Sequence, residues 1–239
     1  MRKTVSVFLA LVAMAFPAQA QDYPFQGFAT DVTMNTLHST MLNATIQSSL
    51  DDASPAPASA TPIDRTLSLY TATPDVSARA QEQFIAFVEE TSGAPGADAV
   101  RKQFAKRSPV ESWAELVAAD GLLPGDAADA IAGYWALNWI IANSAHDQTF
   151  PTAPIAEQVR ASLASDAQWI ALSDAQKQEL SEVLMMNFLL QQAVYSDAVV
   201  TGNGQMISAL GEAAITRFST EMGVDLRAIQ PSSSGFIAR

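Results

Sequence analysis

The sequence predicts an all-α fold, a helical bundle of about six helices that follows a signal peptide and a proline-rich linker. Three observations support this fold class. Apolar residues recur at helical spacing from about residue 64 onward, helix-start signals precede most of these stretches, and alternating strand patterns are nearly absent. Short connections between the expected helices favour a bundle. With 239 residues, 49% of them hydrophobic, the chain is long enough to bury a sizeable core.

The first 20 residues carry the pattern of a secretory signal peptide. Arg2 and Lys3 supply the positive charge, residues 5–16 are almost entirely apolar, and a small-x-small cleavage site ends at Ala20. The apolar stretch is shorter than the roughly 20 residues that cross a bilayer. We therefore expect a bacterial protein that is periplasmic or secreted, with the signal peptide cleaved after Ala20.

The chain after the signal peptide is acidic and contains no cysteine. Without Arg2 and Lys3 it holds 11 basic and 25 acidic residues, a net charge of −14. Such a surface repels phosphate backbones and anionic head groups, so we expect no nucleic-acid partner. The lack of cysteine excludes disulfides, thiolate metal sites and a cysteine nucleophile.

Two segments lie between the signal peptide and the helical domain. Residues 21–50 show helical spacing of apolar side chains but are rich in Thr, Asn and Ser, which predicts a weakly helical or disordered segment. Residues 51–63 combine three prolines with Ala and Ser, which predicts an extended linker. The helical domain is expected over residues 64–239.

Each expected helix has an apolar face, and most have a start or stop signal. In chain order, the apolar positions are Ala80, Phe84 and Val88; Val100 and Phe104; Trp113 and Leu116; Ile131, Trp135 and Trp139; Val159 and Leu163; Leu180, Leu184 and Phe188; and Leu210, Ala214 and Phe218. Capping residues, capping boxes or prolines at the first helical position stand at Thr73–Pro74, Ser108–Glu111, Asp126 and Ser173–Gln176. Glycines end several stretches, and the tail after Gly223 is expected to dock on the bundle.

The fourth expected helix contains the main candidate for a ligand-binding site. Trp135 and Trp139 are four residues apart and share one helix face, with Tyr134 and Asn138 as the adjacent pair. Asn187 interrupts another apolar helix in the same way as Asn138. One interpretation is an aromatic platform with amides that orient a ligand. The other is core packing, in which the indole and amide groups find hydrogen-bond partners within the protein.

The sequence contains little that supports catalysis, and we expect no metal and no cofactor. Its two histidines, His38 and His146, are too far apart for a two-histidine zinc motif, and no calcium-loop pattern is present. His146 precedes Asp147, a pair that suits either base catalysis or a cation near the end of a helix. We identify no catalytic residue.

Four stretches of the sequence together resemble an uncharacterised family of bacterial exported helical domains. They are LSLYTATP (67–74), YWALNW (134–139), LSDAQKQELSEVLM (172–185), and VDLRAIQ with a later GF (224–236). The resemblance covers about residues 65–236. It implies a helical fold and export; it implies no activity and assigns no catalytic residue.

These observations favour an exported, non-enzymatic helical module that binds a protein partner or an apolar small ligand, with no membrane span in the mature chain. The alternative is a carboxylate-based hydrolase that acts on cell-envelope glycans. That reaction needs two carboxyl groups about 5–9.5 Å apart, and the sequence identifies no such pair. A third hypothesis is a structural or assembly role, in which residues 21–63 act as a tether.

Overall fold

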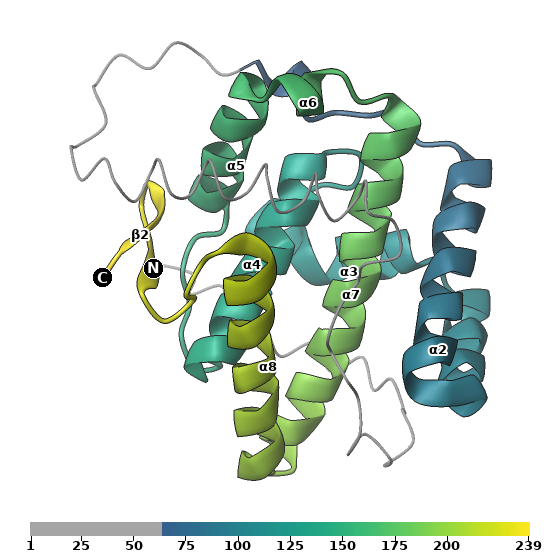
Figure 1. Ribbon diagram of the computed structural model, residues 1–239, viewed down its shortest axis with the longest axis vertical. Coiled ribbons are helices and arrows are strands. Elements are labelled where there is room, and N and C mark those ends of the chain that lie inside the picture. The colour runs from purple at the N-terminus through teal and green to yellow at the C-terminus, as the bar shows by residue number, and fades with distance from the viewer. Residues whose placement is uncertain (1–63) are drawn as a thin grey trace.

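The computed structural model describes residues 64–239, which fold into a helical bundle with a small C-terminal hairpin (Figure 1). The all-α prediction is confirmed, whereas the expected signal peptide (1–20), weak helix (21–50) and linker (51–63) lie outside the described residues. The α-helices are α2 (Pro74–Lys106), α3 (Pro109–Val117), α4 (Ala127–Asn143), α5 (Ala153–Ser165), α6 (Ala167–Ile170), α7 (Asp174–Val200) and α8 (Gly204–Met222). Two 3-10 turns, η2 (Arg65–Leu67) and η3 (Ala118–Asp120), and strands β1 (Ile229–Ser232) and β2 (Gly235–Ala238) complete the described part.

Helix α4 is the central element of the fold. Its residues from Ala127 to Ala142 are all buried, and the helix contacts α5, α7 and α8. The sequence explains this position, because Asp129 is the only charged residue of the helix, and its other residues apart from Asn138 and Asn143 are apolar, aromatic or small. Gly133 adds close packing: a Cβ there would lie only 3.4 Å from the ring of Trp113.

Helix α7 packs against two separate hydrophobic clusters. The larger cluster includes α4 and α8, and the smaller one joins α7 to α2 through Ala80, Phe84, Val88, Val100, Met186 and Leu190. Helix α2 turns sharply at Gly93 (φ 74°, ψ 171°), which confirms the break predicted there. Among the described helices, only α7 matches a membrane span in length and hydropathy, and 56% of its most apolar window is buried. A central core helix has the same properties.

Of the four predicted caps, Asp126 and Ser173 make the expected side-chain bonds, whereas Thr73 and Ser108 stand at the N-cap position without one. Asp126 accepts the Ala128 N–H at 3.0 Å, and Ser173 and Gln176 form a reciprocal capping box. Ser108 makes no side-chain cap bond at the start of α3. Its expected partner Glu111 is exposed, so water competes for that carboxylate.

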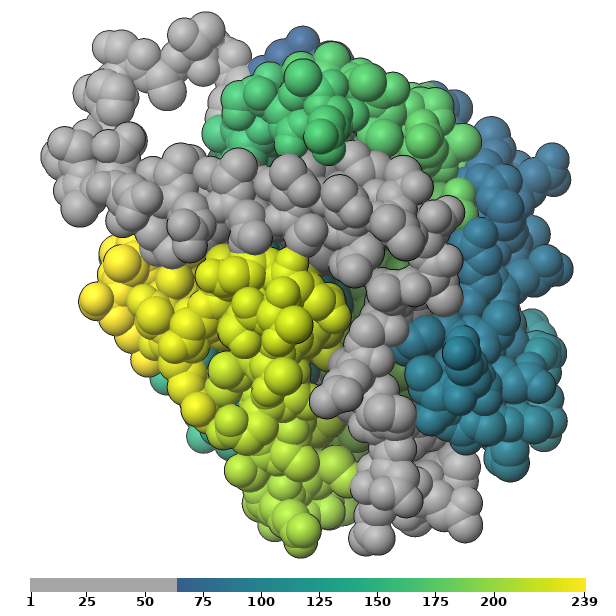
Figure 2. All heavy atoms as spheres, in the orientation of Figure 1, coloured from purple at the N-terminus to yellow at the C-terminus, as the bar shows by residue number. Residues whose placement is uncertain are grey.

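The C-terminal tail forms a two-stranded antiparallel hairpin, which the sequence did not predict. Ile229 pairs with Ala238, and Ser232 pairs with Gly235. Each strand has four residues, and β1 contains Pro231, so the alternation that identifies a strand is too short to recognise. The hairpin contacts α5, and Figure 2 shows the C-terminal residues in yellow along the edge opposite α2.

Candidate functional site

A buried ion-pair network holds α5 against the start of α4. The Arg160 guanidinium binds Asp126 at 2.7 Å and also contacts Asp129, and all three side chains are almost fully buried. Arg160 bonds Glu157 at 3.1 Å, and Glu157 in turn pairs with Arg65 at the surface. Burial raises the pKa of Asp129, and the nearby Asp126 raises it further, while Arg160 opposes both effects. Every charge here has a partner, so the network has a structural role.

Four of the five predicted site residues lie together on α4, in the core. Trp135 packs edge-on against Phe218 with ring centres 4.8 Å apart. The indole N–H of Trp139 donates to the Ile229 carbonyl at 2.9 Å. Asn138 donates to the Tyr134 carbonyl at 2.8 Å.

The amide groups of Asn138 and Asn187 are bonded within the protein. Asn138 accepts a hydrogen bond from Arg217 of α8 through its side-chain oxygen. Asn187 is the fifth predicted residue; it lies on α7 and donates to the Val183 carbonyl at 3.0 Å, one turn earlier in the same helix. The core-packing interpretation therefore describes these amides and the Trp139 indole.

The chain's own Phe236 fills the space between the two tryptophans. Its ring centre lies 6.3 Å from Trp135 and 6.4 Å from Trp139, and its side chain is fully buried. The Trp135 indole N–H is also buried and has no hydrogen-bond partner among residues 64–239. Trp135 and Trp139 thus share one face of α4, and Phe236 of strand β2 covers that face.

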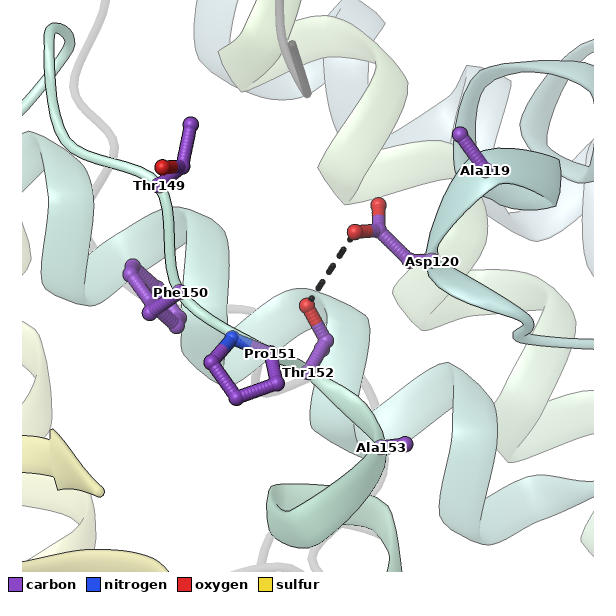
Figure 3. A pocket seen from close by; sticks show the side chains of 7 residues that line it. All are labelled: Ala119, Asp120, Thr149, Phe150, Pro151, Thr152 and Ala153. Carbon is purple, nitrogen blue, oxygen red and sulfur yellow. Dashed lines mark hydrogen bonds between the residues drawn. The ribbon is translucent and has the colours of Figure 1, made fainter. Parts of the chain in front are cut away.

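An open cavity of about 340 Å³ lies between η3 and the segment before α5 (Figure 3). It is lined by Ala119, Asp120 and residues 149–153. Asp120 ends η3, and its carboxylate points into the cavity toward the segment before α5. Phe150 forms one wall and packs edge-on against Trp139 at 5.3 Å, so the cavity is in contact with the aromatic core.

Asp120 is the ionisable side chain among the described residues that line the cavity. Burial raises the pKa of its carboxyl from 3.8 to about 6, while a hydrogen bond from Thr152 acts in the opposite direction. That bond is long, at 3.5 Å between Thr152 Oγ1 and Asp120 Oδ1, so it only weakly satisfies the carboxylate. Near neutral pH the group can therefore accept a hydrogen bond or an ion pair from a ligand. No pattern in the sequence identifies this site, because Asp120 and Phe150 are far apart in the chain.

His146 forms a second polar contact at the far end of α4. Its Nδ1 lies 3.2 Å from the Tyr195 hydroxyl, and its Nε2 lies 3.7 Å from the Asp147 carboxylate. Burial raises the pKa of Tyr195 to about 12, and the charge of Asp147 adds to this effect. The phenol therefore stays protonated and can donate to His146. Asp147 is almost fully exposed, so its interaction with His146 is screened by water.

Metal and glycan chemistry have little support in the described part of the chain. Residues 64–239 contain no group of three or more His, Asp or Glu side chains arranged to hold a metal ion. Asp120 is the single carboxyl group in the lining of the cavity, so the cavity itself lacks the pair that glycan hydrolysis requires.

The fold and this site define a helical-bundle domain with a small open cavity beside an aromatic core. The chain belongs to a family of unknown function (DUF6683), whose model matches residues 1–238. This confirms the resemblance to an uncharacterised family and extends it beyond residues 65–236, to include the N-terminal segment. No curated protein and no solved structure matches the chain significantly.

Proposed function

We propose that this chain is an exported, non-enzymatic helical module that binds a small, largely apolar ligand in the cavity between η3 and the segment before α5. The observation that supports the proposal is the cavity itself, whose lining combines four apolar residues and two threonines with one weakly satisfied carboxyl group. Concave sites with apolar walls and a few polar groups are the usual form of small-ligand sites. Export rests on the pattern of the first 20 residues.

The lining indicates the chemistry of the ligand. Ala119, Phe150, Pro151 and Ala153 offer apolar contact, and the Phe150 ring offers an aromatic face. The Asp120 carboxylate favours a donor group such as an amine or a hydroxyl. A ligand with an aromatic or aliphatic body and one donor group matches both features.

The cavity, rather than an exposed apolar patch, supports the small-ligand form of the proposal. Within residues 64–239 the large exposed apolar side chains are Leu69, Leu123, Ile170, Val200 and Ile237. A protein-partner site would be marked by a contiguous exposed patch of such side chains. No observation favours the glycan-hydrolase alternative or a tether role.

The proposal is tested by following backbone amides in NMR while benzylamine and then toluene are added to the full chain. Benzylamine carries both the ring and the donor group, whereas toluene lacks the donor. We expect shifts at residues 149–153 with benzylamine and much weaker binding of toluene. Asp120→Asn should weaken benzylamine binding at pH 7 by about tenfold, the usual effect of losing one charged hydrogen bond.

Two further variants complete the experiment. Phe150→Ala should weaken benzylamine and toluene alike, because it removes the shared apolar wall. Asp197→Asn removes an exposed carboxylate of α7 outside the cavity and should change nothing. The proposal fails if benzylamine shifts no cavity resonance, or if Asp197→Asn weakens binding as much as Asp120→Asn.

A further inference from the structure

Strand β2 is held against the helices by a reciprocal pair of hydrogen bonds from one side chain. The Phe236 backbone N–H donates to Gln158 Oε1 at 2.8 Å, and Gln158 Nε2 donates to the Phe236 carbonyl at 3.0 Å. The amide of Gln158 thus takes the place of a neighbouring strand. Gly235 allows this approach, because its backbone has φ 107° and a Cβ there would overlap the Gln158 side chain.

Phe236 is the only side chain of β2 that combines deep burial with aromatic contacts. It is fully buried between Trp135 and Trp139, whereas Ile237 and Ala238 are exposed. The Trp135 indole N–H lies in this same core without a hydrogen-bond partner among the described residues. A buried donor without a partner is unfavourable, and an acceptor placed beside it would remove that cost.

We infer that the face of α4 formed by Trp135 and Trp139 is a concealed binding site, which Phe236 occupies in the resting state. When β2 detaches, the site accepts an aromatic ligand that carries a hydrogen-bond acceptor. The ring takes the place of Phe236, and the acceptor satisfies the Trp135 indole N–H. This site is separate from the cavity of Asp120, and the inference does not depend on the proposed function.

Detachment of β2 requires only a local change. The strand has four residues and follows a turn that contains Ser232, Ser233 and Ser234. Strand β1 has its own attachment, because the Ile229 carbonyl accepts the Trp139 indole N–H. Short elements with few backbone hydrogen bonds open below the free energy of global unfolding.

Hydrogen exchange of the full chain tests the inference, with acetophenone as the probe and ethylbenzene as the matched compound without an acceptor. The Phe236 amide should exchange through a local opening that is insensitive to low urea, whereas the Trp139 amide of α4 should exchange through global unfolding. Acetophenone binds only the state in which β2 is detached. At ten times its dissociation constant for that open state, it should raise the population of the open state, and so the Phe236 exchange rate, about tenfold. Ethylbenzene should have a smaller effect.

Variants separate this site from the cavity. Gln158→Ala should raise the Phe236 exchange rate about tenfold or more, since it removes both hydrogen bonds to β2. Ser165→Ala, on an exposed part of the same helix, should leave the rate unchanged. Asp120→Asn should leave the acetophenone effect on Phe236 unchanged while it weakens benzylamine binding.

Three results would overturn the inference. The first is exchange of the Phe236 amide only through global unfolding. The second is a Phe236 exchange rate that acetophenone does not change, even if acetophenone shifts the resonances of the open cavity. The third is an equal increase of the Phe236 exchange rate with ethylbenzene and with acetophenone, which would show that the Trp135 indole N–H does not contribute to binding. Loss of benzylamine binding alone would overturn the proposed function and leave this inference standing.

Discussion

Replacing Asp120 with asparagine should make the folded protein more stable at pH 7 while it weakens ligand binding. The carboxyl has a pKa of about 6 in the folded chain against 3.8 as its ordinary value, and the cause is burial. A shift of about two units corresponds to roughly 3 kcal/mol at most. Because the side chain is partly exposed, solvent screening reduces this to about 1 kcal/mol. Asparagine is neutral and avoids that penalty.

The pH dependence follows from the direction of the shift. The folded-state pKa is raised, so the folded chain binds the Asp120 proton more tightly than the unfolded chain does. Below pH 3.8 both states are protonated, and the group does not affect stability. As the pH rises from about 4 to about 6 the folded state loses this advantage, so wild-type stability falls and then levels off.

Urea unfolding of wild type and Asp120→Asn at several pH values from 3.5 to 7 measures this effect. The free energies of unfolding should nearly coincide at the acidic end and differ by about 1 kcal/mol in favour of the variant at pH 7. Asp197→Asn, an exposed carboxylate, serves as the control with no such change. A variant that is less stable than wild type at pH 7, or a difference that does not vary with pH, would refute the reasoning.

Three further predictions concern stability, each measured as a urea unfolding free energy at pH 7. Arg160→Met leaves the buried carboxylates of Asp126 and Asp129 without their cation and should lower the free energy of unfolding by about 3–5 kcal/mol. Arg227→Met removes an exposed ion pair and should lower it by less than about 1 kcal/mol. Equal losses would contradict the structural role of the buried network. Ser173→Ala should cost about 1 kcal/mol and Ser108→Ala almost nothing, because only Ser173 forms a cap bond; the reverse order would contradict the assigned caps. Gly235→Ala should lower the free energy of unfolding by more than about 1 kcal/mol, because the residue has a positive φ and an added Cβ would overlap the Gln158 side chain. An unchanged midpoint of urea unfolding would contradict that geometry.

Local sequence signals predicted the helices well because they act over a few residues. Asp126, Ser173 and Gly93 mark their boundaries through hydrogen bonds or backbone conformations that the sequence specifies directly. The Ser108 cap was wrong because its partner Glu111 is free to be hydrated instead. Helix-boundary signals of this kind predict the order of the helices along the chain, but they do not predict which helices pack against each other.

The sites depend on contacts between residues far apart in the chain, which the sequence does not reveal. Asp120 meets Phe150 across a cavity, and Arg160 reaches Asp126 across 34 positions. The tryptophan pair of α4 was identified from its spacing, but Phe236 as its occupant was not, since it lies about 100 residues later in an unpredicted hairpin. The matching family has no known activity, so the proposed binding chemistry is inferred from the structure alone.

Native mass spectrometry of the chain recovered from the periplasm of an expressing bacterium tests export and ligand binding together. We expect a processed chain that begins at Gln21 and carries a small non-covalent adduct, which is absent from an Asp120→Asn, Phe150→Ala double variant. An uncleaved chain would contradict export. A wild-type chain without an adduct, or an adduct that the double variant retains equally, would contradict ligand binding in the cavity.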